Sequence, residues 1–218
     1  MEIILGQFSK VLNTSSSRFG NVAFSNGSLL DGMVNRYNSN QPIVAPTDIK
    51  RYFLTPLEAA KLSILSTFKS KSGQIFIPVT KNKNLKQDFP SIVNNFLNKY
   101  GYKMDIMKSE ESARKGINAS LKNHKWPCYL FKSDTTGEKL EEVFIADHEI
   151  RKKSIFSDIE VIDIQDIKTK QETQRFIDEI ISLQNSDDLS INNIKIIIEK
   201  FIDNFSHKET GRYLESKM

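Results

Sequence analysis

The stretch TPLEAAKLSILSTFKSKSGQIFIPV, residues 55–79, joins a helix to a strand and decides the fold class. Its start has the pattern of a capping box: Thr55 and Glu58 can each accept the other's backbone N–H, and Pro56 suits the first helical position. The apolar residues that follow recur at helical spacing, and after Gly73 the run QIFIPV is typical of a buried strand. A capped helix that leads into a buried strand predicts an α/β fold.

The segments on the amino-terminal side extend this pattern. Residues 14–19, TSSSRF, predict a short strand, and Ser28 is a suitable cap for a helix that runs to about Tyr37. Residues 41–46, QPIVAP, predict a short extended piece, and residues 2–12 have helical spacing. The order strand, loop, helix and strand is that of an α/β sheet domain.

Helices dominate the second half of the sequence. An amphipathic helix is predicted before Gly101, a strand over residues 102–107, and a further helix that Ser109 opens. The sequences QDIKTKQETQRFIDEIISLQ and SINNIKIIIEKFIDNF predict two carboxyl-terminal helices. We therefore expect three successive parts, a sheet domain with a ligand loop over residues 1–80, a second lobe over 81–164 and a helical extension over 165–218.

Composition excludes several classes of protein. The 31 lysine and arginine residues exceed the 27 acidic residues, giving a net charge of +4, but they are dispersed, whereas a nucleic-acid-binding module needs a clustered basic stripe. A single cysteine, Cys128, permits neither an internal disulfide nor a cysteine-based zinc site, and no metal site is predicted. No apolar run approaches a length of about 20 residues, which is needed to span a bilayer. We expect no membrane span and a cytoplasmic location.

The segment RFGNVAFSNGS, residues 18–28, follows the first predicted strand and is a candidate ligand loop. In an open α/β sheet, ligands bind beyond the carboxyl ends of the strands. Arg18 can fork onto a carboxylate or a phosphate, and Asn21 offers both a donor and an acceptor. Gly20 and Gly27 allow the backbone to approach a ligand closely. A structural role fits as well, with Arg18 paired to a carboxylate and the glycines turning the chain.

Four segments in order carry a resemblance to a known family. They are SSRFGNVAFSNGSLL (16–30), PIVAPTDIKRYFLTPLEAAKL (42–62) with IFIPV after it, KSDTTGEKLEEV (132–143) and HKETGRYLESKM (207–218). This order resembles the CapD-like polysaccharide-biosynthesis branch of the extended short-chain dehydrogenase/reductase superfamily. The segment KWPCYLFKSDTTGEK is similar to the corresponding segment of UDP-N-acetylglucosamine 4,6-dehydratases. The resemblance implies the carboxyl-terminal part of a Rossmann-type NAD(P)-binding fold, an α/β substrate-binding lobe and carboxyl-terminal helices.

The resemblance implies a nucleotide-sugar lyase whose complete form uses NAD(P), takes a UDP-sugar as substrate and forms homo-oligomers. Members of the branch hold the cofactor on a Gly-x-x-Gly-x-x-Gly turn and react through a Tyr-x-x-x-Lys pair, but this sequence has neither upstream of Arg18. The resemblance places Met1 inside the helix that carries the pair. We therefore expect a carboxyl-terminal portion, from a fragmentary gene, a split gene or an internal start, which has no catalytic residue and is inactive alone.

The resemblance also implies which residues would bind the substrate. Arg51 matches an arginine that approaches the diphosphate, Asn21 an asparagine near the sugar and phosphate, and Glu138 a glutamate near the ribose. The set also contains Arg18 and a turn over the substrate that consists of Ser25, Asn26, Gly27 and Ser28. The alternatives are a surface cation for Arg51, a turn residue for Asn21 and a helix N-terminal acid for Glu138. Thr135 and Thr136 stand where many relatives have Arg-Pro, so one phosphate-binding cation is absent.

Other functions stay open at this stage. An epimerase of the same superfamily fits equally well, because the groups that choose between elimination and inversion lie mostly outside this sequence. A standalone nucleotide-sugar-binding remnant is a further alternative. His124 and Cys128 suggest a base and a nucleophile, but sequence neighbours seldom form such pairs, and Trp126 beside Pro127 predicts a packed corner.

Overall fold

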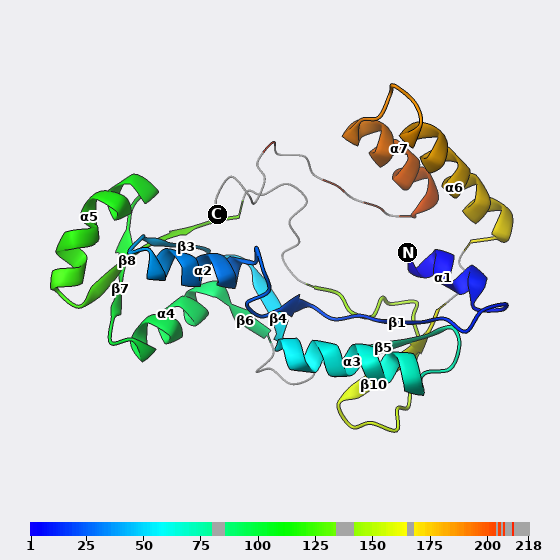
Figure 1. Ribbon diagram of the computed structural model, residues 1–218, viewed down its shortest axis with the longest axis horizontal. Coiled ribbons are helices and arrows are strands. Elements are labelled where there is room, and N and C mark those ends of the chain that lie inside the picture. Colours follow the sequence, from blue (N-terminus) through cyan, green and yellow to red (C-terminus); the bar gives the residue numbers. More distant parts are fainter. Residues whose placement is uncertain are drawn as a thin grey trace. The chain divides into compact units, whose positions relative to one another are not determined.

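The computed structural model describes residues 1–79, 86–133, 142–164 and 168–203, together with residues 205, 207 and 211. The chain forms two compact units, and Figure 1 labels most elements of both. Unit 1 comprises Met1–Arg18, Leu62–Pro78 and Ile145–Lys208, and unit 2 comprises Phe19–Lys61, Val79–Phe144 and Glu209–Met218. These units differ from the three successive parts expected from the sequence, because strands that are distant along the chain pair with each other within each unit.

A four-stranded sheet forms the centre of unit 1. Its order is β1 (Ser15–Ser17), β5 (Gln74–Pro78), β10 (Ile159–Asp163) and β9 (Arg151–Lys152). β1 runs parallel to β5, whereas β10 is antiparallel to both of its neighbours. Phe76 of β5 packs with Val161 of β10 and with Leu62 of helix α3 (Pro56–Lys69), which forms one buried cluster. The helix and strand predicted over residues 55–79 are therefore present, and they pack on each other from Leu62 onward.

Three more helices belong to unit 1: α1 (Glu2–Phe8), α6 (Lys170–Gln184) and α7 (Ile191–Phe201). α6 begins at a capping box between Thr169 and Glu172. Phe176 of α6 stacks on Phe201 of α7, with ring centroids 4.2 Å apart. Within the part of the chain that the structure describes, no helix combines the length and the apolar character that a bilayer crossing requires.

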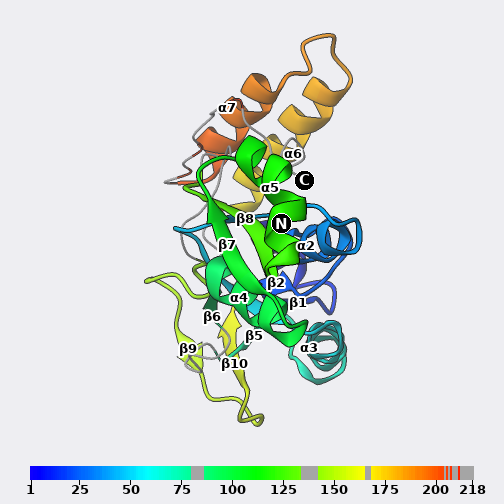
Figure 2. The same ribbon diagram turned by 90° about the vertical axis from the view of Figure 1, so that its left-hand side faces the viewer.

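Unit 2 is built on a parallel three-stranded sheet in the order β3 (Ile43–Pro46), β8 (Lys125–Phe131) and β7 (Lys103–Met107). Three helices cover it, namely α2 (Leu29–Asn38), α4 (Phe89–Lys99) and α5 (Glu110–Lys122). Side chains alternate along β8, so Trp126 and Cys128 point to the face that α2 and α4 cover. On the opposite face Asp105 of β7 accepts a hydrogen bond from Ser120 of α5 at 2.7 Å. Figures 1 and 2 show α5 on that other side of the sheet.

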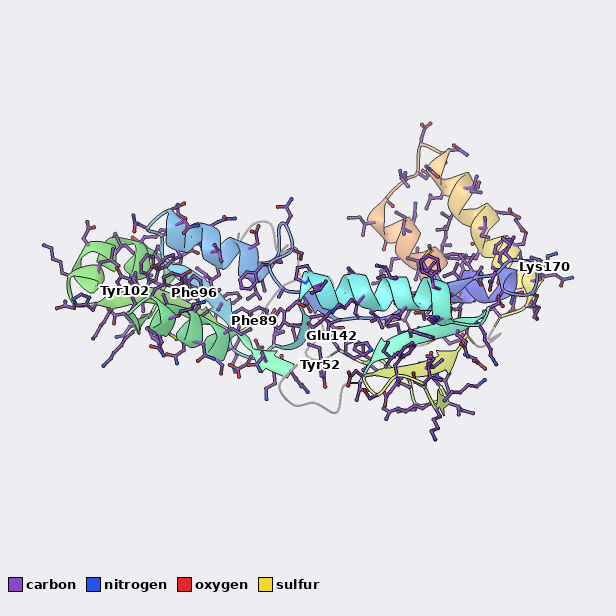
Figure 3. All side chains as sticks on the ribbon, turned by 60° about the horizontal axis from the view of Figure 1, so that its bottom comes forward. Tyr52, Phe89, Phe96, Tyr102, Glu142 and Lys170 are labelled. Carbon is purple, nitrogen blue, oxygen red and sulfur yellow. The ribbon has the colours of Figure 1, made fainter. Side chains whose placement is uncertain are left out.

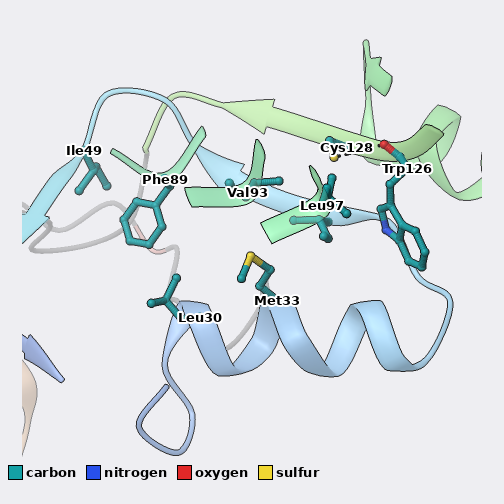
Figure 4. Close-up of a cluster of buried hydrophobic side chains, with 10 residues drawn as sticks. Leu30, Met33, Ile49, Phe89, Val93, Leu97, Trp126 and Cys128 are labelled. Atoms are coloured by element: carbon teal, nitrogen blue, oxygen red, sulfur yellow. Dashed lines mark hydrogen bonds between the residues drawn. The ribbon is translucent and has the colours of Figure 1, made fainter. Parts of the chain in front are cut away.

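The core of unit 2 lies between this sheet and α2 and α4. Figure 4 shows Met33 of α2 and Leu97 of α4 beneath Trp126 and Cys128 of β8. The indole N–H of Trp126 donates to the Gln41 carbonyl at 3.0 Å, so the buried ring keeps its polar atom satisfied. The buried members of the cluster are Leu30, Met33, Ile43, Ala45, Ile49, Phe89, Val93, Leu97, Trp126 and Cys128.

A second, smaller sheet in unit 2 positions the candidate ligand loop. Its order is β2 (Asn21–Val22), β4 (Lys50–Leu54) and β6 (Lys86–Asp88). β2 is parallel to β4, and β6 is antiparallel to β4. Asp88, at the end of β6, caps α4 by accepting from the Ser91 N–H at 2.8 Å. This cap lies where the chain leaves β6 of the small sheet and enters α4, which packs on the main core of unit 2.

The predicted helix ends are confirmed, but one predicted corner is wrong. Ser28, Thr55 and Ser109 each cap a helix, and Gly101 takes the left-handed conformation, with φ of +80°, just after α4. Trp126 and Pro127 are the second and third residues of the central strand β8 instead of a packed corner. A proline has no N–H for a strand ladder and therefore argued against a strand. In the fold, β3 pairs with β8 only from Cys128 onward, so Pro127 interrupts no ladder with β3.

Candidate functional site

The pairing of β2 with β4 brings the candidate loop next to Arg51. Asn21 lies opposite Phe53, and Val22 lies opposite Leu54. The pairing continues one residue further, where the Ala23 N–H donates to the Leu54 carbonyl at 2.8 Å. Arg51 precedes Phe53 by two residues on the same strand, so these two side chains share one face of β4. Two segments that are about 30 residues apart in the sequence therefore form one local site.

Gly20 is required by this strand pairing. A Cβ atom at Gly20 would lie 2.5 Å from the Tyr52 carbonyl oxygen and 3.3 Å from Cζ of Phe144. The ring of Phe144 in turn makes an edge contact with Tyr52, with centroids 5.1 Å apart. The glycine thus allows close approach of the loop to β4 itself, whereas the sequence suggested close approach to a ligand.

Arg51 is the buried cation of the site, with only 6% of the residue exposed. Its Nη1 donates to the Lys50 carbonyl at 3.0 Å, and its Nε lies 3.5 Å from Oε1 of Glu142. Figure 3 shows Glu142 beside Tyr52. The 3.5 Å separation is longer than the 2.7–2.9 Å of a strong charge-assisted hydrogen bond. The surface-cation alternative for Arg51 is therefore excluded, and Glu142 is a carboxylate close to its guanidinium group.

The turn after β2 exposes polar groups and uses others internally. Asn21, Ser25 and Asn26 are exposed. The Ser28 hydroxyl accepts the Asp31 N–H at 3.2 Å as the cap of α2, and the Gly27 N–H donates to the Asp31 carboxylate at 3.1 Å. Asp31 therefore already places a negative charge at the amino end of α2. The amino end of α2 is therefore a poor position for a further anion.

Phe24 is a residue of this turn that the sequence analysis missed. Its φ angle is +58°, a left-handed conformation that is rare for a bulky side chain, and 54% of the residue is exposed. Strained backbone of this kind clusters at ligand sites. The only signal in the sequence was an aromatic residue placed directly before the turn SNGS, residues 25–28.

A small hollow adjoins the turn. It has a volume of about 240 Å³ and is lined by Gly27, Asp31, Gly32, Asn35, Arg36, Ser39 and Gln41. This volume falls below the roughly 300–1,000 Å³ of pockets that enclose small molecules. The hollow is too small to hold a nucleotide sugar by itself.

Arg18 lies in unit 1 and pairs with two carboxylates. Its Nη1 and Nη2 lie 2.7 Å from the two carboxylate oxygens of Glu149, and its Nε lies 2.8 Å from Oε1 of Glu2. Burial lowers the pKa of Arg18, but the hydrogen bonds to both carboxylates raise it further, so the net shift is upward. This geometry is the structural pairing that the sequence left open for Arg18. Glu138, the last predicted site residue, lies outside the described residues.

The Cys128 thiol does not fit a nucleophile. The side chain is fully buried in β8, and burial raises its pKa to about 12. His124 is exposed and lies before the start of the same strand. A reactive cysteine needs a lowered pKa and access to solvent, so Cys128 is part of the core.

Comparisons with known proteins find a matching family model, a similar protein sequence and similar solved structures. A family model described as "Polysaccharide biosynthesis protein" matches residues 5–164. An uncharacterized membrane protein of Methanocaldococcus jannaschii is 31% identical over 87 residues, which cover 39% of this chain and 26% of that protein. The X-ray structure of Pen from Bacillus thuringiensis superposes with a TM-score of 0.55 at 20% identity, over 81% of this chain and 54% of that chain. This last likeness confirms the predicted α/β fold class. The chain spans about half the length of the Pen structure and about a quarter of the Methanocaldococcus jannaschii protein.

Proposed function

The chain belongs to the polysaccharide biosynthesis protein family, and from this premise we propose that it is the substrate-binding portion of a nucleotide-sugar 4,6-dehydratase that acts on UDP-N-acetylglucosamine. The observation that carries the proposal is the β2–β4 pairing, which sets Asn21 opposite Phe53, two residues along β4 from the buried Arg51. A diphosphate needs cationic and N–H donors, and a sugar needs groups that both donate and accept. Arg51 supplies the first kind of group, and Asn21 supplies the second.

Two further side chains have roles in this proposal. Phe24 presents an exposed ring in the same turn, and an aromatic face can stack on a base. Glu142 holds the Arg51 guanidinium while the site is empty and gives way to the diphosphate when the ligand binds. The ligand thus replaces one anion by another, and Arg51 is never left buried without a counter-charge.

NAD(P) would supply the hydride transfer in the complete enzyme. The residues of this chain do not fit that cofactor, because the sequence has no Gly-x-x-Gly-x-x-Gly turn to receive a pyrophosphate. The proposed cofactor site and the proton-transferring residues therefore lie outside these 218 residues. The role proposed for this chain is to bind and orient the UDP-sugar.

Calorimetric titration with UDP-N-acetylglucosamine tests the proposal. Arg51→Gln should weaken binding by at least about tenfold, the effect of losing a charge-assisted hydrogen bond to phosphate. Glu142→Gln should strengthen binding, because it removes the competing carboxylate. The matched control is Arg114→Gln, which removes an exposed arginine that is ion-paired to Glu110 on α5 and should leave the affinity unchanged. Equal effects of the two arginine variants would refute the proposed site.

The dehydratase and epimerase alternatives are separated by their products. In an assay with a complementing cofactor-binding half, a dehydratase product has lost one water, whereas an epimerase product has the mass of its substrate. Mass spectrometry of the sugar nucleotide therefore decides between them. Binding without turnover in that assay would favour the non-catalytic alternative.

A further inference from the structure

A basic groove lies on unit 1, apart from the groups discussed so far. It has a volume of about 670 Å³, and five lysines from three separate stretches of chain line it: Lys10, Lys69, Lys71, Lys152 and Lys153. All five are exposed. Asp163 is the only acid among the described residues of the lining, and it forms an ion pair with Lys152. The groove therefore carries a surplus of positive charge, although the lysines of the sequence as a whole are dispersed.

The loops that carry Lys10 and Lys71 are held in place by hydrogen bonds. The Ser72 hydroxyl lies 2.7 and 3.0 Å from the carbonyl oxygens of Ser9 and Leu12, which share its single proton, and it accepts the Thr14 N–H at 3.2 Å. The Gly73 N–H donates to the Thr14 carbonyl at 2.8 Å. These bonds tie the loop between α1 and β1 to the loop between α3 and β5. Lys10 and Lys71 are thus presented by fixed backbone.

The position of the groove separates it from a site at the carboxyl ends of the strands. Ser72 and Gly73 precede the amino end of β5, and Thr14 precedes the amino end of β1, which runs parallel to β5. Arg18, by contrast, follows the carboxyl end of β1. Ligands of open α/β sheets bind at the carboxyl ends of the strands. The groove is therefore not a ligand site of that kind.

Large apolar side chains accompany the lysines in the sequence and are strongly exposed. Val11 follows Lys10 and is 77% exposed, and Phe68 precedes Lys69 and is 76% exposed. Leu12 and Ile155, close to Lys10 and Lys153, are 60% and 87% exposed. Single exposed apolar residues are common, but Ile155 itself lines the groove, and the other three lie within two residues of lysines that line it.

We propose that this surface of unit 1 is a peripheral contact with an anionic membrane. Lysines near a bilayer are attracted by acidic headgroups, and bulky apolar side chains insert at the boundary between headgroups and acyl chains. A soluble phosphate compound or a nucleic acid would use the lysines but would leave Val11, Leu12 and Ile155 in water. The lipid surface is the partner that uses both kinds of side chain. This inference does not rest on the nucleotide-sugar proposal.

Vesicle flotation tests the contact. The chain is mixed with vesicles of phosphatidylcholine alone or of phosphatidylcholine with phosphatidylglycerol, and the bound fraction is measured at rising salt concentrations. We expect binding to the anionic vesicles only, with a decline as salt screens the charges. Each lysine should contribute about fivefold to the partition coefficient. Equal binding to both kinds of vesicle, or none to either, would overturn the proposal.

Three variants identify the surface. The first replaces four lysines of the groove by glutamine and should lower binding by about a hundredfold or more: Lys10→Gln, Lys69→Gln, Lys71→Gln and Lys153→Gln. The control makes an equal change of charge at exposed positions of unit 2 and should leave binding unchanged: Lys99→Gln, Lys103→Gln, Lys122→Gln and Lys125→Gln. Val11→Asn with Leu12→Asn and Ile155→Asn keeps every lysine and should also weaken binding. Equal loss of binding in both lysine variants would mean that binding depends on net charge alone and not on this groove. Full competition by inorganic pyrophosphate, with no effect of the apolar variant, would assign the groove to a soluble phosphate.

Discussion

Arg18 and Glu149 form a fork-to-fork ion pair: Nη1 and Nη2 of the arginine lie 2.7 Å from the two carboxylate oxygens of a glutamate that is 131 residues further along the chain. The Arg18 side chain also binds Glu2, so one guanidinium joins α1, the residue after β1 and the segment before β9. A lysine cannot reproduce this bidentate geometry. The pair is therefore a long-range clamp within unit 1.

Arg18→Lys should lower the free energy of unfolding by about 2 kcal/mol, the scale of lost hydrogen bonds to a charged group. Urea denaturation followed by circular dichroism measures the change. Arg114→Lys is the control, because that arginine is half-exposed and makes a single ion pair along its own helix. The control should change stability by less than about 0.5 kcal/mol. Equal losses of stability in the two variants would mean that the bidentate pairing of Arg18 adds nothing to the free energy of unfolding.

The contribution of Glu149 should depend on pH. Burial raises the pKa of Glu149, but the hydrogen bonds from the Arg18 side chain and the Ala146 N–H lower it more, so the folded-state pKa lies below the unfolded value of about 4.3. The stabilisation is then complete above that unfolded value and is lost as the pH falls through the folded pKa. Glu149→Gln should therefore be destabilising at neutral pH and approach the wild-type stability on acidification below about pH 4. A difference that is constant across this pH range would exclude the ion pair as its cause.

Gly20→Ala should destabilise unit 2, because the new Cβ would lie 2.5 Å from the Tyr52 carbonyl oxygen. Overpacking of this kind costs about 1–3 kcal/mol. Gly32→Ala provides the opposite case: no atom lies within 4 Å of its Cβ position, and the residue is inside helix α2. It should stabilise the chain by up to about 1 kcal/mol. Thermal melts of the two variants should move in opposite directions from the wild type.

Phe24 allows strain to be separated from binding. Phe24→Gly removes the cost of the left-handed backbone, whereas Phe24→Ala keeps it, so the glycine variant should be more stable by about 1 kcal/mol. Both variants lose the ring, and both should weaken UDP-N-acetylglucosamine binding by about fivefold or more if the ring stacks on the base. Unchanged affinity in both variants would assign the conformation to the turn alone.

The Cys128 thiol should be inert in the folded protein. Its burial and its raised pKa of about 12 leave neither access nor thiolate for reaction near neutral pH. A chromogenic thiol reagent should therefore report no reaction until urea unfolds unit 2. Rapid reaction of the native protein would contradict the placement of β8 in the core.

Local signals in the sequence predicted local structure well. The helix starts at Ser28, Thr55 and Ser109 could be predicted, because a cap acts through hydrogen bonds within three residues. The grouping into units could not be predicted in the same way, since β3 pairs with β8 about 80 residues later and β5 pairs with β10. Strand pairing over such distances depends on which buried faces fit together, and no local pattern carries that information.

The candidate site was predictable only in part. The turn at residues 25–28 and Arg51 could be named in advance, but their juxtaposition depends on the short parallel strand β2, which has only two residues, Asn21 and Val22. Glu142 could not be linked to Arg51 from the sequence, because they are 91 positions apart. The strain at Phe24 is likewise a property of the folded turn, and the identity of the residue does not reveal it.

The most direct test of the account is to add UDP-N-acetylglucosamine to the isotopically labelled chain and follow the backbone amide signals by NMR. The account predicts that the largest shifts fall on the turn at residues 21–28 and on the β4 residues around Arg51, and that Arg51→Gln abolishes them while Arg114→Gln does not. Shifts that are absent from this turn, or that persist unchanged in Arg51→Gln, would contradict the proposal that these residues bind the nucleotide sugar.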